Sequence, residues 1–414
     1  MDSLLQSLKV LDLTDEKGLL AGRVLADFGA DVIKIEKPGG DDARSIGPFY
    51  NNTPDKEKSL FWFAHNLNKR SITLNIETRD GQQIFKDLVA KADVVIESFQ
   101  PGHLDKIGLG YHSLEDINPA IIMASVTPFG QTGPYRDYVA SDIVIMAMSG
   151  HLYLSGDPDR PPVRFGVPQA SLNGALEAAT GVMIALYYRD FTGEGQHVDV
   201  SMQQSLGYAL VQTVPFWVLD KNVLERSGHF RVGLTSNTRQ RQTWPCKDGM
   251  VNFVIYGGLT GSHVNRALVD WMDEEGMCPD YLKNIDFNTW DVFNITQEGW
   301  KDIEGPIGEF FFTHTKAELL EEGVKRQCPI CPVSSPSEVA NYSQLMAREF
   351  WLDVEHPELG TTIMYPGFFG KLSETPCRLY RRPPLIGEHN MEIYQDLLGL
   401  SEKEIVMLKQ ANII

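Results

Sequence analysis

The sequence predicts an α/β protein, with a doubly wound parallel sheet in a large domain and a smaller α+β domain. Short β-type runs alternate with amphipathic helical segments through the first half of the 414 residues, which is the order that builds βαβ units. After about residue 222 this alternation gives way to basic and aromatic loops with short strand signals. A chain of this length also exceeds the size that one hydrophobic core usually serves, which favours two domains.

The first βαβ unit consists of two strand-like segments, 8–13 (LKVLDL) and 31–36 (DVIKIE), with a helix over 18–28 between them. The same signals recur along the chain. Further strands are predicted at 71–76, 93–97, 120–126 and 197–202, and further helices at 79–91, 101–108, 142–148 and 171–188. Because helical crossovers join neighbouring strands in parallel, these segments predict a single doubly wound sheet.

Changes in residue composition and in the pattern of strand and helix signals set the predicted domain boundaries. Residues 1–222 form the first part of the large domain and residues 223–315 form the small domain, which contains a strand signal (DGMVNFVIY), a glycine-containing turn (GGLTG) and a helix (HVNRALVDWM). Residues 316–414 return to complete the large domain and end in a helix (SEKEIVMLKQANII). The order is therefore large, small, large.

Composition and charge restrict the classes of partner. A net charge of −18 disfavours a general affinity for nucleic acid or for an anionic membrane, so a polyanionic ligand needs a local basic pocket. The start, MDSLLQSLKVLDLT, lacks a basic signal-peptide region, and the longest apolar runs are too short to span a bilayer, so we expect a cytoplasmic protein. Cys328 and Cys331 form a CPIC pair without a second pair at zinc spacing, which predicts a turn and no metal site.

Six segments together resemble the class III (CaiB/BaiF, formyl-CoA transferase-like) CoA-transferases. They are VLDLTDEKGLLAGRVLADFGADVIKIEKPGGDDAR, NLNKRSITLNI, ADVVIESFQPGHLDKIGLGY, INPAIIMASVTPFGQTGPY, VRFGVPQASLNGALEAATGVMIALYYRDFTGEGQ and PPLIGEH. The resemblance implies a Rossmann-like large domain, an interlocked dimer, and CoA or acyl-CoA as a substrate without a permanently bound cofactor.

Ser171 stands where this family carries its catalytic aspartate. In the family, that carboxylate attacks an acyl-CoA thioester, forms a mixed anhydride and then becomes a CoA thioester. A serine hydroxyl is far less acidic, and its sequence neighbours cannot take its proton. We therefore predict no catalytic residue in this chain. Asp142 matches an acidic position beside the family's active site and is a weak alternative, since a helical aspartate here more often caps a helix.

The resemblance also implies a CoA-binding set in the large domain: Lys37, Lys69, Arg70, Ser98, Phe99 and Lys106. The four cations lie near predicted strand ends, where open α/β sheets bind ligands, and CoA carries three phosphate groups. Ser98 and Phe99 fall in the loop that follows the pantetheine arm in the family. Lys106 replaces the more usual arginine, which keeps the charge and loses bidentate phosphate recognition. We expect this set to be vestigial if the chain has lost its chemistry.

The most economical function is that of a supporting subunit in a heteromeric CoA-transferase that moves CoA from succinyl-CoA to a carboxylic acid. Its partner would be a homologous catalytic subunit that keeps the aspartate. In the small domain, His229, Arg231, Arg239 and Trp244 are candidates for facing the partner's site, and Gly257, Gly258 and Gly261 resemble the family's glycine-rich loop.

Two alternatives stay open at the level of sequence. One is a self-sufficient homodimeric transferase that uses Asp142, another carboxylate, or direct attack by the substrate's own carboxylate. The other is a scaffold or sensor that binds CoA esters without turnover.

Overall fold

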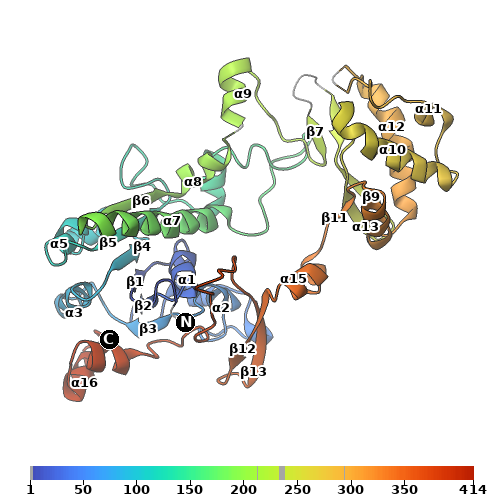
Figure 1. Cartoon of the computed structure of the whole chain (residues 1–414). Coiled ribbons are helices and arrows are strands. Elements are labelled where there is room, and N and C mark those ends of the chain that lie inside the picture. Colours follow the sequence, from blue (N-terminus) through green and yellow to red (C-terminus); the bar gives the residue numbers. More distant parts are fainter. Residues whose placement is uncertain (1–2, 212, 233–237, 293) are drawn as a thin grey trace. The chain divides into compact units, whose positions relative to one another are not determined.

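The computed structural model describes residues 3–211, 213–232, 238–292 and 294–414 (Figure 1). The chain divides into two compact units. The first comprises Met1–Leu152, Arg164–Asp220 and Met346–Ile414, and the second comprises Tyr153–Val163 and Lys221–Leu345. The C-terminal segment therefore rejoins the unit that the N-terminal segment begins.

The first unit is built on a six-stranded parallel sheet with the order β3-β2-β1-β4-β5-β6. Its strands are β1 (Lys9–Leu13), β2 (Asp31–Glu36), β3 (Arg70–Thr73), β4 (Val94–Glu97), β5 (Ile122–Thr127) and β6 (His197–Ser201). The strand order reverses between β1 and β4, and ligands of doubly wound sheets bind beyond the carboxyl ends of the strands at such a point. The predicted parallel α/β sheet is present.

Helices cover both faces of this sheet. Val10 of β1 faces a core that includes α1 (Leu19–Asp27) and α7 (Gln169–Thr192), whereas Leu11 faces a core that includes α3 (Arg79–Val89) and α16 (Glu402–Gln410). Side chains that alternate between two covered faces are apolar on both, which explains the nearly continuous apolar strands. In Figure 1 the C-terminal α16 lies beside the early helix α3.

Shorter elements complete the first unit. They are η1 (Asp42–Ser45), η2 (Tyr50–Asn52), α2 (Leu60–His65), α4 (His103–Lys106), α5 (Tyr111–Glu115), α6 (Asp142–Met148), α8 (Met202–Ala209), α9 (Thr213–Asp220), the hairpin β12 (Trp351–His356) and β13 (Thr361–Pro366), and the π-helical turn η3 (Glu392–Leu397). The hairpin buries Val354 and Tyr365 against Trp62 and Phe63. That core joins chain segments about three hundred residues apart in sequence.

The second unit has its own core around a three-stranded sheet with the order β11-β10-β9. Its elements are β7 (Phe230–Val232), β8 (Arg239–Arg241), β9 (Thr243–Cys246), β10 (Gly249–Asn252), α10 (Gly258–Glu274), α11 (Asp280–Lys283), α12 (Gln297–Thr313), α13 (Lys316–Lys325), β11 (Cys331–Pro332) and α14 (Pro336–Ala340); α15 (Ser343–Ala347) spans its end. The predicted boundary at residue 316 is wrong. Leu319, Cys328 and Ile330 pack in the same core as Trp244, so this unit continues to Leu345.

Within the part of the chain that the structure describes, no helix has both the length and the apolar character required to cross a bilayer.

Candidate functional site

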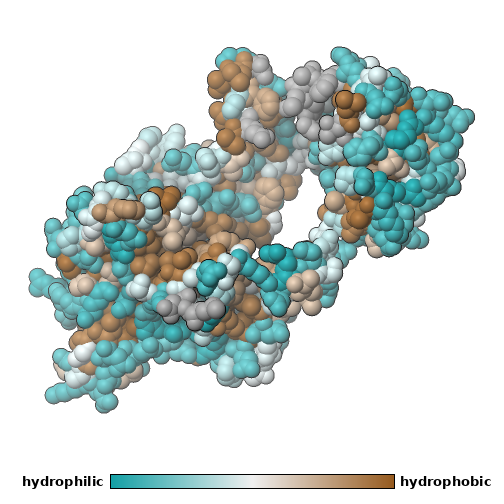
Figure 2. All heavy atoms as spheres, viewed as in Figure 1, coloured by the Kyte–Doolittle hydropathy of each residue, from teal (hydrophilic) through white to brown (hydrophobic). Residues whose placement is uncertain are grey.

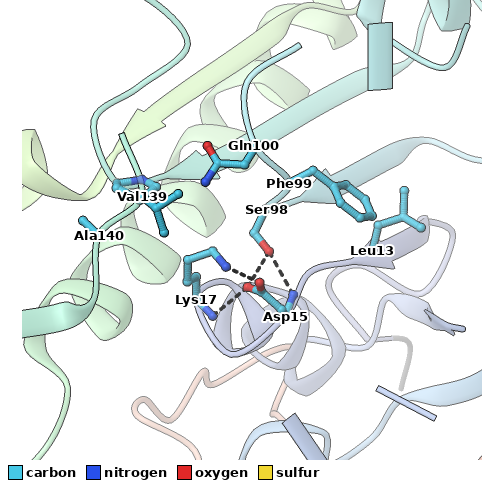
Figure 3. A pocket seen from close by; sticks show the side chains of 9 residues that line it. Leu13, Asp15, Lys17, Ser98, Phe99, Gln100, Val139 and Ala140 are labelled. Atoms are coloured by element: carbon cyan, nitrogen blue, oxygen red, sulfur yellow. Dashed lines mark hydrogen bonds and ion pairs between the residues drawn. The ribbon is translucent and has the colours of Figure 1, made fainter. Parts of the chain in front are cut away.

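A cavity of about 230 Å³ lies at the carboxyl ends of β1 and β4, where the strand order reverses (Figure 3). Its lining comprises Leu13, Asp15, Lys17, Ser98, Phe99, Gln100, Pro128, Val139 and Ala140. Most of these residues lie at strand ends: Leu13 ends β1 and residues 15 and 17 follow it, 98–100 follow β4, and Pro128 follows β5. The parallel sheet thus brings three strand-end loops to one position suited to a ligand.

Asp15 fastens two of these loops to each other. The Ser98 hydroxyl donates to Asp15 Oδ1 at 2.7 Å and accepts from the Asp15 backbone N–H at 2.8 Å. Lys17 forms an ion pair with the same carboxylate (Figure 3). The charged groups that line this cavity therefore satisfy one another before any ligand arrives.

A second cavity, of about 530 Å³, shares Leu13, Asp15 and Phe99 with the first. The rest of its lining comes from the ends of β2 and β3 and from the C-terminal tail: Glu16, Ile35, Glu36, Lys37, Pro38, Asp41, Asp42, Leu74, Asn75, Ile76, Glu77 and Asn412. The two cavities together extend along the carboxyl edge of the sheet from β3 to β5.

The predicted CoA set is only partly assembled at this edge. Ser98 and Phe99 lie in the loop after β4 and line the first cavity, and Lys37 lines the second. The Lys37 ammonium lies 2.7 Å from both carboxylate oxygens of Asp42. Lys106 is exposed at the end of α4 and lines neither cavity.

Lys69, which precedes β3, and Arg70, which begins it, line neither cavity. Lys69 is fully buried, and its ammonium donates to Asp12 at 2.7 Å and to the Leu19 carbonyl at 2.7 Å. Arg70 pairs with Asp31 and, at 2.7 Å, with Glu392. Both cations therefore link parts of the first unit, and their assignment to the CoA-binding set stays a prediction.

Ser171 lies in the first turn of α7 and is half-buried. The neighbouring Ala170 backbone N–H donates to Asp142 Oδ1 at 2.7 Å, so the first residue of α6 caps the start of α7. Oδ2 of Asp142 is buried and has no hydrogen-bond partner among the described residues. The chain that lines the first cavity at Val139 and Ala140 leads directly into this α6–α7 contact.

Glu97 is a site residue that the sequence reasoning missed. It is buried at the end of β4, and its Oε2 accepts the Phe99 backbone N–H at 2.7 Å, which fixes the loop that lines both cavities. Burial raises the pKa of Glu97 to about 7, although the hydrogen bonds from Ser125 and Phe99 oppose this rise. A carboxylate as the last residue of a buried strand was the available signal.

The candidates in the second unit have ordinary structural roles. Trp244 is completely buried and donates its indole N–H to the Phe253 carbonyl at 2.8 Å, so the proposal that it faces a partner is corrected. Arg239 is held by the Gln297 side chain through its backbone, and His229 stacks against Phe230. The side chain of Arg231 lies outside the described residues. The glycine-rich loop is the turn into α10: Gly257 precedes the helix, Gly258 has φ +64°, and Gly261 lies in the helix.

Comparison with known proteins adds independent information. The family model described as CoA-transferase family III matches residues 5–390. The chain is 34% identical over 389 residues to the Succinyl-CoA:(R)-benzylsuccinate CoA-transferase subunit BbsE of Thauera aromatica, covering 93% of this chain and 92% of that protein. It is 32% identical over 394 residues to the Succinyl-CoA--L-malate CoA-transferase beta subunit of Chloroflexus aurantiacus, covering 94% and 93%. The crystal structure of a CAIB/BAIF family protein from Brucella suis superposes with a TM-score of 0.81 at 29% identity, covering 96% of this chain and 100% of that one.

Proposed function

This chain belongs to CoA-transferase family III, and we propose that it is the non-catalytic subunit of a heteromeric enzyme that moves CoA from succinyl-CoA to a carboxylic acid. Its partner in this proposal is a homologous chain that carries the catalytic aspartate. The acceptor acid is a dicarboxylate of the (R)-benzylsuccinate type, because the relative at 34% identity is named for that substrate.

The observation that carries this proposal is the environment of Asp142, the carboxylate that bonds the backbone of Ala170, the residue before Ser171. Asp142 Oδ1 accepts a hydrogen bond from the Ala170 N–H, and Oδ2 has no exposed surface with which to reach a thioester. Among the described residues, no hydrogen bond links the Ser171 hydroxyl to a histidine or a carboxylate that could take its proton. Neither residue therefore offers this chain a ready nucleophile.

Exposed apolar surface supports the need for a partner. On α7, Ile184, Tyr187 and Phe191 are 64%, 68% and 74% exposed, although the other side of this helix packs on the sheet. The helix α9 likewise exposes Val214, Val218 and Leu219, and Figure 2 shows apolar side chains over it. Large exposed apolar side chains such as those of α7 and α9 are typical of a protein interface. A partner with fewer acidic residues suits this face, because two copies of a chain with net charge −18 repel each other.

In the proposed complex, the chemistry takes place on the partner. Its aspartate attacks the thioester carbonyl of succinyl-CoA, which forms a mixed anhydride and releases the CoA thiolate. The thiolate then attacks the aspartyl carbonyl, which releases succinate and leaves a CoA thioester of the aspartate. The acceptor carboxylate attacks this thioester, forms a second mixed anhydride and releases the CoA thiolate. The thiolate finally attacks the acceptor's carbonyl, which gives the acceptor's CoA thioester and frees the aspartate. This chain contributes the folded framework, with Ser171 unable to start the sequence.

The test is to purify the complex from the source organism through a tag on this chain and to identify its chains by native mass spectrometry. We expect a second chain of similar size that carries aspartate at the position equivalent to Ser171, and transfer of CoA from succinyl-CoA to (R)-benzylsuccinate or another dicarboxylate. Replacing the partner's aspartate with alanine should abolish transfer, whereas Ser171→Ala should leave it unchanged.

Asp142→Asn separates this proposal from a self-sufficient homodimer. Asparagine keeps the Oδ1 acceptor for Ala170 and removes the carboxylate, so turnover should persist if the partner supplies the nucleophile. A homodimer that transfers CoA and loses activity in Asp142→Asn would overturn the proposal. Binding of CoA esters without turnover beside every co-purified homologue would instead support a scaffold.

A further inference from the structure

The carboxyl edge of the sheet carries a charge pattern that does not suit CoA. Six carboxylates and one lysine line the larger cavity. The carboxylates are Asp15, Glu16, Glu36, Asp41, Asp42 and Glu77, and the lysine is Lys37. The smaller cavity adds a second lysine, Lys17. A pocket that receives a polyanion normally presents an excess of cationic side chains.

Both lysines at this edge already have carboxylate partners. Lys37 lies 2.7 Å from each oxygen of Asp42, and Lys17 pairs with Asp15. A phosphate that recruits either lysine must displace a carboxylate and leave it facing the phosphate. The lysines therefore neutralise the chain's own acids and leave no net positive charge for a ligand.

Two buried cations likewise pair with carboxylates of the cavity lining. Glu36 pairs with the buried Arg44 at 2.6 Å, and Asp41 lies 3.1 Å from the buried ammonium of Lys34. These cations are fully buried and face inward, so they offset the two carboxylates without reaching the cavity. Glu16 and Glu77, which are exposed, then give the lining a net negative charge. Glu77 Oε1 also lies 2.9 Å from His103 Nε2.

We propose that this cleft rejects the phosphate groups of CoA, and that the complex binds one CoA for each pair of chains, on the catalytic partner. This inference rests on the proposed function and assigns the CoA site to one of the two subunits. Juxtaposed like charges disfavour a wrong ligand strongly, so CoA should bind this cleft at least about 100-fold more weakly than it binds the partner's. The fold retains the cleft, but its carboxylates repel the phosphate groups of the nucleotide.

The first measurement is the number of CoA molecules that saturate the purified complex, by equilibrium dialysis and native mass spectrometry at 0.15 M salt. We expect one CoA per pair of chains. Two equivalent CoA molecules per pair would overturn the inference, and transfer activity in the same sample would show that the proposed function still stands. A complex that neither binds CoA nor transfers it would overturn both.

A charge reversal tests the cause. In the double variant Glu16→Lys and Glu77→Lys, the net change of four charges at the exposed rim should create a second CoA site and raise the stoichiometry towards two. The control is Asp116→Lys on the same unit, an exposed residue that follows α5 and lines neither cavity, and it should leave the stoichiometry at one. Equal behaviour of the double variant and the control would contradict the charge mechanism, and a misfolded double variant would leave the stoichiometry of the unaltered complex as the deciding result.

Discussion

Two lysine–carboxylate pairs in the first unit have the same shortest N–O distance and different surroundings. Lys69 and Asp12 lie 2.7 Å apart with both side chains fully buried, and Lys37 and Asp42 lie 2.7 Å apart with side chains 56% and 80% exposed. We compare Asp12→Asn with Asp42→Asn. Both substitutions remove one negative charge and keep the size of the side chain, so burial is the variable that differs.

The expected magnitudes follow from that difference. In Asp12→Asn the Thr14 N–H and hydroxyl still have an oxygen to bond, but the Lys69 ammonium loses its counter-charge inside the protein. Breaking a buried pair by removing one partner costs about 3–5 kcal/mol, because it leaves an uncompensated charge. An exposed pair contributes below about 1 kcal/mol, so Asp42→Asn should be nearly neutral.

Hydrogen exchange followed by mass spectrometry measures this cost for each unit separately, so it needs no two-state unfolding of the whole chain. Peptides from β1 and β3 should exchange about a hundred-fold to several thousand-fold faster in Asp12→Asn, since each 1.4 kcal/mol is a factor of ten. Peptides from α12 in the second unit serve as the internal control and should not change. Equal protection of β1 in the two variants would refute the reasoning, as would full protection in Asp12→Asn.

Three further predictions concern single side chains. Burial raises the pKa of Glu97 to about 7 from an ordinary value of 4.5, so the folded state holds this proton more tightly than the unfolded state does. The free energy of unfolding should therefore fall by up to about 3 kcal/mol as the pH rises from about 4.5 through 7. Glu97→Gln should flatten this fall when the hydrogen-exchange protection of β4 is measured against urea concentration at several pH values, and an unchanged slope would show that another group causes it. Trp244→Ala should destabilise the second unit by about 3–5 kcal/mol, because the indole is completely buried, and leave exchange in β1 unaltered. Gly22→Ala should cost about 1–3 kcal/mol, because its Cβ would lie 2.3 Å from Asp12 Oδ2; the control Gly207→Ala, where a Cβ meets no atom within 4 Å, should be neutral or slightly stabilising in the same exchange experiment.

Local sequence patterns predicted most of the strands and helices of the first unit. Strands β1, β2, β4 and β6 and helices α3 and α6 lie within one or two residues of the predicted segments, and α7 extends four residues beyond its predicted end, because apolar periodicity is a property of neighbouring residues. The boundary at residue 316 failed for the opposite reason. Leu319 and Trp244 belong to one core although they lie 75 positions apart, and such a long-range relation leaves no local pattern.

The candidate site shows the same division. Sequence alone determined that Ser171 replaces a carboxylate, that the first half forms a parallel sheet, and that the chain carries a large negative charge, because each depends on residue identity or short-range order. Only the tertiary structure decided which charges meet. It buried Lys69 against Asp12 inside the first unit and gathered six carboxylates around the larger cavity. Strand direction and burial decide which charged groups meet, and the residues adjacent in sequence do not encode either of them.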